Sequence, residues 1–343
     1  MAVFNHVSYD DHQEVVFCHD KASGLKAIIA VHNTNLGPAF GGCRMWHYQN
    51  DDDALNDVLR LSRGMTYKNA LAGLHMGGGK SVIIADPKST DREALFRAFG
   101  RFVHTLGGLY YSAEDVGVST KDIMFAHQET PYVAGLEGKS GDPSPFTALG
   151  TYLGIKAANK HQNGTDNLAG LKISVQGVGH VGYHLCKYLH KEGAELIVTD
   201  IDQVALDRVA NEFNALVVAP QDIYHQDVDI YSPCALGATI NDTTLPLLKA
   251  KIIAGCANNQ LAELRHGEQL KSMGILYAPD YVINAGGIIN VSFENDYDAE
   301  RSRRKVENIY QTLESIFQQA DAQNRTTNAV ADEMARAIIE AAR

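Results

Sequence analysis

The stretch L-K-I-S-V-Q-G-V-G-H-V-G at residues 171–182 decides the fold class of this chain. Its apolar start predicts a buried strand, a G-x-G-x-x-G turn follows, and the residues after the turn predict a helix. A strand, such a turn and a helix in this order are typical of a dinucleotide-binding unit. Gly177 permits the tight turn, and Gly179 lets the backbone approach a pyrophosphate at the helix N-terminus. Gly182 allows the helix to pack closely on the strand.

Asp200, an acidic residue after the next predicted strand, favours NAD over NADP as the bound dinucleotide. The run E-L-I-V-T-D ends at Asp200, about 20 residues beyond the glycines, where a carboxylate can take the ribose hydroxyls. The same charge would repel the 2′-phosphate of NADP, so we expect NAD as the cofactor. The simpler alternative is a chance glycine loop beside an exposed aspartate.

Further short apolar runs continue this pattern toward the end of the chain. The predicted strands are L-K-I-S-V (171–175), E-L-I-V-T (195–199), D-I-Y-S (229–232), K-I-I-A-G (251–255) and I-L-Y-A (275–278). Helical stretches separate several of them, which is typical of a parallel sheet with crossover helices. Apolar residues between Val306 and Ile339 recur every three or four positions, so the end of the chain is predicted to be helical.

The first part of the chain mixes elements without this regular alternation. Residues 25–31 and 81–85 are apolar runs that predict strands. Residues 51–63 predict a helix, because acids lead and arginines trail, as the helix dipole favours. With 343 residues, the chain is long enough for two domains.

Composition excludes several classes of protein. The chain is 45% hydrophobic and 21% charged, and its net charge of −11 argues against a nucleic-acid binder. The start lacks the pattern of a signal peptide, and no apolar run reaches the ~18 residues of a membrane span. Five scattered cysteines form no C-x-x-C pair, so we expect reduced thiols, no metal site and a cytoplasmic protein.

The stretch G-L-H-M-G-G-G-K-S at residues 73–81 resembles a phosphate-binding loop but has the wrong glycine spacing, so a P-loop nucleotidase is a weak alternative. A second hypothesis makes Lys80 a reacting group. Lys68 lies 12 residues upstream, and two ammonium groups facing one pocket would favour one neutral base and one anion-binding cation. Two solvated surface lysines are the simpler alternative.

Two further stretches complete a candidate site. In Y-S-A-E-D-V-G (111–117), the Glu114-Asp115 pair follows a possible strand, and a carboxylate there could exchange protons with an amine or cap the next segment. Two lysines, a carboxylate and NAD suit the oxidation of an α-amino acid. In L-G-P-A-F-G-G-C-R (36–44), Phe40 either fills the core beside a plain turn or lies where backbone approaches a ligand.

Taken together, these motifs resemble those of the amino-acid dehydrogenases that act on glutamate, leucine, valine and phenylalanine. The similarity extends to R-G-M-T-Y-K, G-D-P-S-P, P-C-A-L-G, A-N-N-Q-L and P-D-Y-V-I-N-A-G-G. These motifs occur in the family's order and span nearly the whole chain. The leucine-specific members are the most similar.

The resemblance implies an α/β protein of two domains with a catalytic cleft between them. Residues 1–140, joined by a C-terminal helix at 320–343, would bind substrate and form a homo-oligomer, a dimer or an octamer. Residues 141–319 would form the Rossmann domain. Lys68 would bind the substrate carboxylate, Lys80 would be the general base that activates water, and Asp115 would shuttle the proton on nitrogen.

The resemblance also implies which residues hold the cofactor. Asn259 would help to hold substrate or cofactor. The full expected NAD site is Gly177, Val178, Gly179, His180, Val181, Gly182, Asp200, Ile201, Cys234, Ala235, Ala257, Asn258, Asn259 and Asn284. The leucine enzymes usually have aspartate where this chain has Asn258, so the chain departs from the leucine-specific pattern at this residue.

The expected substrate is a small apolar L-amino acid. Phe40 stands where the glutamate enzymes place a lysine, so a substrate carboxylate side chain would be buried without a partner. Gly41 and Gly42 would bring backbone close to the substrate, and Ala113 resembles the leucine enzymes. Ile288 and Val291 would line the pocket. The predicted reaction is NAD-dependent deamination of leucine or another branched-chain amino acid to its 2-oxo acid and ammonia, and the reverse amination. The alternatives are an aromatic-specific enzyme and a non-catalytic dinucleotide sensor.

Overall fold

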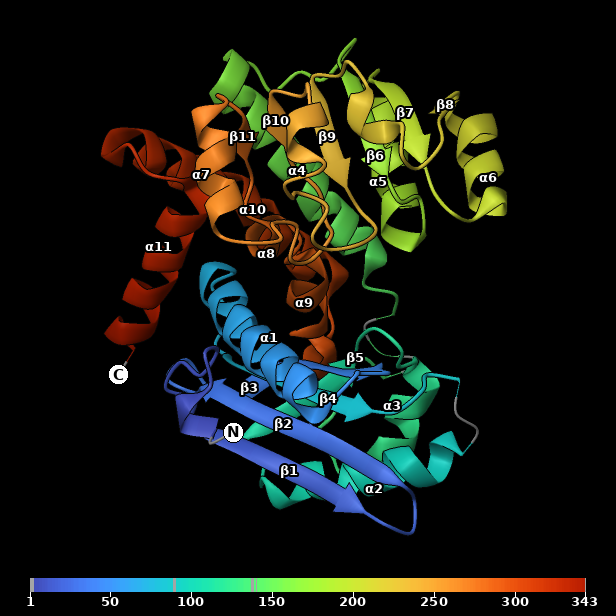
Figure 1. Ribbon diagram of the computed structural model, residues 1–343, viewed down its shortest axis with the longest axis vertical. Helices are drawn as coiled ribbons and strands as arrows, with labels where there is room; N and C mark the ends of the chain where they lie inside the picture. Colours follow the sequence, from blue (N-terminus) through green and yellow to red (C-terminus); the bar gives the residue numbers. More distant parts are fainter. Residues whose placement is uncertain (1–2, 89–90, 137–138, 140, 343) are drawn as a thin grey trace. The chain divides into compact units, whose positions relative to one another are not determined.

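The computed structural model describes residues 3–88, 91–136, 139 and 141–342. They form two compact units (Figure 1). Unit 1 comprises Met1–Gly141, Val291–Tyr297 and Ala335–Arg343, and unit 2 comprises Asp142–Asn290 and Asp298–Met334. Of the predicted C-terminal segment 320–343, the part up to Met334 therefore groups with unit 2. The functional bounds expected from the sequence stay predictions.

Unit 1 is built on a five-stranded mixed sheet in the order β1-β2-β4-β3-β5. β2 pairs with β1 and β4 in antiparallel fashion, whereas β3 runs parallel to both β4 and β5. The strands are β1 (Glu14–Asp20), β2 (Leu25–Asn33), β3 (Ala39–Trp46), β4 (Gly77–Ile84) and β5 (Tyr110–Glu114). A short 3-10 helix, η1 (Val3–Asn5), precedes them.

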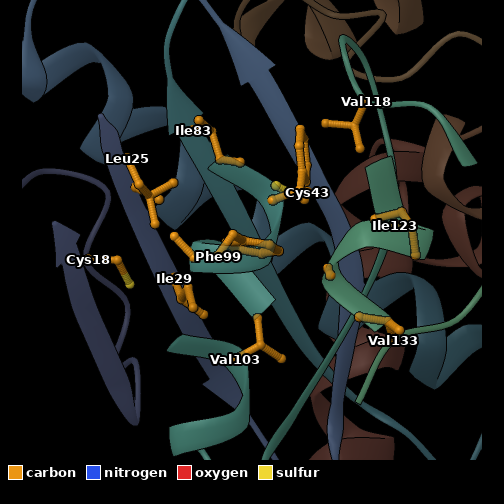
Figure 2. Packing of buried hydrophobic residues seen from close by; sticks show 14 of the residues in the cluster. Cys18, Leu25, Ile29, Cys43, Ile83, Phe99, Val103, Val118, Ile123 and Val133 are labelled. Atoms are coloured by element: carbon orange, nitrogen blue, oxygen red, sulfur yellow. The ribbon is translucent and has the colours of Figure 1, made fainter. Parts of the chain in front are cut away.

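Helices cover both faces of this sheet (Figure 1). Helix α1 (Asp51–Leu71) packs on one face, and α2 (Arg92–Thr105) and α3 (Thr120–His127) pack on the other. Successive strand residues point to opposite faces, so Ile28 joins the α1 cluster while Ile29 joins the cluster under α2. Figure 2 shows this second cluster, in which Ile29, Cys43 and Ile83 lie near Phe99.

The two glycine-rich stretches of unit 1 lie mainly in strands. The stretch around Phe40 contributes to β3, and Gly77–Lys80 open β4, which starts ahead of the predicted 81–85. A Cβ on Gly41 would lie 1.9 Å from the carbonyl oxygen of Gly79, and one on Gly78 would lie 2.1 Å from the backbone nitrogen of Thr66 in α1. The glycines therefore let β3 and α1 approach β4. The P-loop alternative is wrong, because Lys80 lies inside a strand and not at the start of a helix.

Unit 2 contains a six-stranded sheet in the order β11-β10-β9-β6-β7-β8, and every pairing is parallel. The strands are β6 (Lys172–Gln176), β7 (Glu195–Thr199), β8 (Leu216–Val217), β9 (Ile230–Pro233), β10 (Ile252–Ile253) and β11 (Leu276–Tyr277). The prediction of a parallel sheet is confirmed. The order 3-2-1-4-5-6 is that of the doubly wound dinucleotide-binding fold, and it reverses between β6 and β9, where such folds bind ligands.

The remaining helices belong mainly to unit 2 and include the helical end of the chain. They are α4 (Ser144–Asn163), α5 (His180–Lys191), α6 (Gln203–Phe213), α7 (Arg265–Ser272), α8 (Asp280–Ile283), α9 (Gly286–Val291), α10 (Ala299–Gln323), α11 (Thr327–Ala341), η2 (Ile223–His225), η3 (Leu245–Leu247) and η4 (Glu294–Asp296). Asn324, with φ of 53°, separates α10 from α11. The part of α11 from Ala335 onward belongs to unit 1, and within that unit Arg336 donates a hydrogen bond to the Tyr67 hydroxyl at 2.9 Å. None of the described helices combines the length and hydropathy that a membrane span requires.

Candidate active site

Lys80 and Asp115, far apart in the sequence, form a buried ion pair in unit 1. Lys80 lies on β4 and is 6% exposed, and its Nζ is 3.1 Å from Oδ2 of Asp115, the first residue after β5. β3 lies between these strands, and a Cβ on Gly42 would lie only 3.0 Å from Cβ of Asp115. Gly42 therefore leaves the room in which Asp115 reaches the lysine. The structure thus brings Lys80, the predicted base, into contact with Asp115, the predicted proton carrier.

Arg44 is a second cation at the same carboxylate. Its Nε donates to Oδ2 of Asp115 at 3.1 Å, and its Nη1 lies 3.0 Å from Oδ2 of Asp57 on α1. The hydroxyl of Tyr48 donates to the same oxygen of Asp57 at 2.7 Å. Burial alone raises the pKa of Asp115, but the charges and hydrogen bonds of Lys80 and Arg44 outweigh it and hold the pKa at about 2. Asp115 is therefore ionised at neutral pH.

The sequence analysis missed Arg44, Asp57 and Tyr48. Arg44 is the last residue of the stretch L-G-P-A-F-G-G-C-R. Because a turn was considered there and not a strand, the direction of the Arg44 side chain was not predicted. As a strand, the stretch places alternate residues on one face, which would have put Arg44 beside Gly42. That alternation is the signal in the sequence.

The other predicted substrate residues of unit 1 lie on the same three strands and on α1. Phe40 is 4% exposed and is aligned with Gly78, whose missing side chain faces α1. Ala113 is aligned with Gly42 and is 9% exposed. Lys68 lies on α1 and is half-buried.

The two residues predicted on α9 divide between the units. Ile288 groups with unit 2 and Val291 with unit 1, and both are half-buried. Their contribution to a substrate pocket stays a prediction.

In unit 2, the three glycines of the G-x-G-x-x-G turn have different surroundings. Gly177 has φ of +100°, and a Cβ there would lie 2.6 Å from Cβ of Ala235. A Cβ on Gly182 would lie 2.0 Å from the carbonyl oxygen of Gly177, whereas one on Gly179 would meet no described atom within 4 Å. Two glycines are required by packing, and the third leaves its side of the turn open.

That open side is the start of α5. Gly179 is the N-cap, and no described side chain caps the helix there. The first N–H groups of a helix need partners from outside it, and an anion satisfies them well. His180 and Val181, the first residues of α5, flank this position.

Asp200 is fixed beside the glycine turn by three backbone donors. Its Oδ2 accepts from the N–H of Val178 at 2.7 Å, and its Oδ1 accepts from Ile201 at 2.7 Å and Asp202 at 3.0 Å. The carboxylate is half-buried at the carboxyl end of β7. A fixed negative charge at this point fits the ribose hydroxyls of a dinucleotide.

The remaining predicted cofactor residues follow the strands on the other side of β6. Cys234 and Ala235 come directly after β9, and Ala257, Asn258 and Asn259 follow β10. Because the carboxyl ends of parallel strands share one edge, the sheet brings these residues to the edge that carries the glycine turn.

Asn284 joins this edge through two hydrogen bonds. Its Nδ2 donates to the carbonyl of Cys256 at 3.0 Å and to Oδ1 of Asn258 at 2.7 Å. Its own Oδ1 is buried and has no hydrogen-bond partner among the described residues. A buried acceptor without a partner is costly, and the amide of a nicotinamide is a group that would satisfy it. The residues present therefore fit a dinucleotide.

One cluster among the described residues has the donor atoms of a metal site. Ligand atoms of Asp242, Glu263 and His266 lie within 4.8 Å of one another. Arg265 already donates to Asp242 at 2.6 Å and to Glu263 at 2.9 Å, so its guanidinium takes the place of a cation there. The five cysteines are all free thiols, and four of them are buried.

Comparison with known proteins adds independent evidence. The family model described as "Glu/Leu/Phe/Val dehydrogenase, dimerisation domain" matches residues 12–133, and that described as "Glutamate/Leucine/Phenylalanine/Valine dehydrogenase" matches residues 198–343. Leucine dehydrogenase of Bacillus subtilis is 55% identical over 99% of this chain and 94% of its own length. Phenylalanine dehydrogenase of Lysinibacillus sphaericus is 47% identical over 96% of this chain and 89% of its own length.

A solved structure agrees with these matches. The crystal structure of L-tryptophan dehydrogenase from Nostoc punctiforme has a TM-score of 0.85 and 48% identity, covering 97% of this chain and 96% of that one. The resemblance expected from the motifs is confirmed. The chain is an amino-acid dehydrogenase and belongs to the glutamate/leucine/phenylalanine/valine dehydrogenase family.

Proposed function

We propose that this amino-acid dehydrogenase uses NAD to deaminate L-leucine and other branched-chain L-amino acids, giving the 2-oxo acid, ammonia and NADH, and that it catalyses the reverse amination. The observation that carries the proposal is the buried pair of Lys80 and Asp115, whose Nζ and Oδ2 lie 3.1 Å apart. A base and a proton carrier in contact are what the deamination of an amine requires.

In the proposed reaction, NAD accepts the hydride from the substrate Cα, and the chain supplies charge and proton transfer. Lys68 binds the substrate carboxylate through its ammonium group. Asp115, held ionised, accepts a proton from the substrate nitrogen. Lys80 acts as the base after its ammonium group has given up a proton to solvent, and the neutral amine takes a proton from the water that adds to the iminium carbon. Asp115 then returns its proton to the nitrogen, the C–N bond breaks to release ammonia, and the hydroxyl proton leaves to give the 2-oxo acid.

The cofactor preference rests on Asp200. Members of this family generally use NAD or NADP. The carboxylate of Asp200 accepts three backbone hydrogen bonds beside the glycine turn, and its charge disfavours the 2′-phosphate of NADP. We therefore expect NAD.

The substrate preference rests on Phe40 and on the relatives. A buried phenyl ring at this position offers no partner for the side-chain carboxylate of glutamate. The relative at 55% identity is named a leucine dehydrogenase, whereas the phenylalanine and tryptophan enzymes are 47% and 49% identical. Leucine is therefore the first choice and an aromatic amino acid the second.

We further propose that the enzyme works in the cytoplasm as a homo-oligomer. Free cysteines in the structure suit a reducing compartment. The first matching family model is described as a dimerisation domain. Light scattering of the purified protein tests the assembly, and a monomer would contradict it.

A substrate panel tests the proposal. Leucine, isoleucine, valine, phenylalanine, tryptophan and glutamate are each supplied with NAD or NADP, and the reduced cofactor is followed by absorbance. The expected result is the highest kcat/KM for leucine with NAD. A higher value for phenylalanine or tryptophan would overturn the substrate, and NADH binding without turnover of any amino acid would favour the sensor alternative.

A further inference from the structure

Arg44 links two carboxylates that come from different elements of unit 1. Its Nε contacts Asp115 at 3.1 Å, and its Nη1 contacts both oxygens of Asp57, at 3.0 and 3.3 Å. The guanidinium is planar and its donors have a fixed geometry. Fixing one end on α1 therefore also fixes the direction of the other end toward Asp115.

The contacts divide the two oxygens of Asp115. Lys80 and Arg44 both approach Oδ2, and Oδ1 receives no hydrogen bond from the residues that the structure describes. With Oδ2 held by two cations, Oδ1 is the oxygen left for another donor. A substrate nitrogen is a donor of the required kind.

We propose that Arg44 is a positioning residue, which holds Asp115 by Oδ2 so that Oδ1 can serve the substrate nitrogen, and which stays charged throughout the reaction. This inference rests on the proposed function. Lys80 changes its protonation state when it takes a proton from water, but an arginine keeps its charge at every pH at which proteins are folded. Arg44 therefore keeps a positive charge at Oδ2 in every state of Lys80.

Asp57 compensates the permanent positive charge of the partly buried Arg44. Two cations and two carboxylates balance, which lowers the cost of burying the group. The Tyr48 hydroxyl occupies a further lone pair of Asp57. Asp57 thus orients Arg44 and neutralises it without touching Asp115.

The charges around Asp115 set the expected pH dependence. It is faced by Lys80 from β4, by Arg44 and the Cys43 thiol from β3, and by the Tyr110 phenol from β5, and Glu114 at the end of β5 directly precedes it. From the side of α1, Asp57 contributes a negative charge through its ion pair with Arg44, and the Tyr48 phenol donates to Asp57 and interacts with Asp115. Because the cations lower the pKa of Asp115, loss of Arg44 raises that pKa. A larger share of Asp115 is then protonated in weak acid.

The experiment compares Arg44→Gln, Arg44→Lys and Asp57→Asn with the wild type, using the pH profile of kcat/KM for leucine. In Arg44→Gln we expect kcat to fall about 10- to 100-fold through loss of orientation, an unchanged KM for NAD, and an acid limb at higher pH. Arg44→Lys keeps the charge, so its acid limb stays near the wild-type position. Asp57→Asn leaves Arg44 charged but unanchored, so kcat falls while the acid limb does not move to higher pH.

The matched control is Arg92→Gln. Arg92 also holds a carboxylate of unit 1, with Nε 2.7 Å from Oδ1 of Asp122, but it lies outside the proposed site. This variant lowers the melting temperature and leaves the acid limb in place. If Arg44→Gln behaves like Arg92→Gln, or if Asp57→Asn keeps the wild-type kcat, the inference is wrong.

A readout without turnover separates this inference from the proposed function. Carboxylate NMR follows the titration of Asp115 in the wild type and in Arg44→Lys and Arg44→Gln. A higher pKa of Asp115 in Arg44→Gln alone supports the inference even if leucine is not the substrate. An unchanged pKa contradicts it even if the wild type oxidises leucine.

Discussion

Lys80 and Asp115 meet across an intervening strand, with Nζ 3.1 Å from Oδ2. Replacing Lys80 with alanine removes the proposed base, and we expect kcat to fall by ~10²–10⁴-fold. NADH binding, measured by fluorescence titration, should stay near the wild-type value, because the dinucleotide residues belong to unit 2. Lys26→Ala, an exposed lysine on β2 of the same sheet, is the control and should keep full activity. Substantial turnover in Lys80→Ala would rule out its role as the base.

Phe40→Leu tests the substrate preference. Replacing the ring with a smaller side chain makes room, so the ratio of kcat/KM for leucine to that for phenylalanine should move toward phenylalanine, by no more than ~1–3 kcal/mol. Phe99→Leu is the control, because Phe99 lies on α2 and is fully buried against the other face of the sheet (Figure 2). It should lower the melting temperature and leave the ratio unchanged. The same ratio in both variants would make Phe40 a core residue only.

Gly179→Ala and Gly182→Ala separate binding from packing in the glycine turn. A Cβ at Gly179 meets no described atom within 4 Å, whereas one at Gly182 lies 2.0 Å from a carbonyl oxygen. Gly179→Ala should keep the wild-type melting temperature but weaken NADH binding, because the methyl group occupies the side open to the pyrophosphate. Gly182→Ala should lose about 1–3 kcal/mol of stability through overpacking. Calorimetry and NADH titration distinguish them; unchanged NADH affinity in Gly179→Ala would place the pyrophosphate elsewhere.

Asp200→Asn removes the charge beside the glycine turn. NAD should bind about 10-fold more weakly, since a charge-assisted hydrogen bond is worth ~1.5–3 kcal/mol, and the preference for NAD over NADP should shrink. Asp202→Asn is the control: Asp202 caps α6, and asparagine caps a helix as well as aspartate does. The KM values of both cofactors provide the measurement. An unchanged preference in Asp200→Asn would remove Asp200 from the cofactor site.

A buried histidine predicts acid sensitivity. Burial, assisted by the neighbouring charge of His12, lowers the pKa of His32 from 6.5 to about 4, and the two rings lie 4.8 Å apart. Between these values the folded state binds fewer protons than the unfolded state. The stabilisation is therefore complete above pH ~6.5 and is lost as the pH falls through about 4, by about 3 kcal/mol in total.

Urea unfolding at about pH 7 and about pH 5 measures this loss. In His32→Gln the difference between the two free energies of unfolding should shrink by the part that His32 contributes. His19→Gln, an exposed histidine on β1, should keep the wild-type difference. An equal pH dependence in all three proteins would assign the acid sensitivity to other groups.

Much of unit 2 was predictable because its signals are local. Five of the six strands of the parallel sheet are short apolar runs that the sequence predicted, whereas the exposed two-residue strand β8 (Leu216–Val217) was missed. The glycine turn was predictable because its glycines and the helix start that follows are adjacent in the sequence. Only the short strands were overestimated: the predicted 251–255 contributes Ile252 and Ile253 alone. The placement of Asp200 also followed from chain distance, since it directly follows β7, the strand next to β6.

Unit 1 was predicted less well, because its determinants are long-range contacts. Gly-Pro and Gly-Gly pairs locally favour turns, yet Ala39–Trp46 forms a strand. The reason is that Gly41 must approach Gly79, and Gly78 must approach Thr66 of α1. These close contacts involve residues that are distant in the sequence, so the residues next to each glycine do not predict them.

By itself, the sequence determined the dinucleotide-binding fold and the family, and it selected Lys80 and Asp115 as the predicted base and proton carrier, because these inferences depend on residue type and spacing along the chain. Only the tertiary structure decided that Lys80 and Arg44 share one oxygen of Asp115 and that Asp57 holds Arg44 from α1. Those contacts join β3, β4, β5 and α1, and the pairing of charges across them depends on the sheet order and on the space that Gly42 leaves.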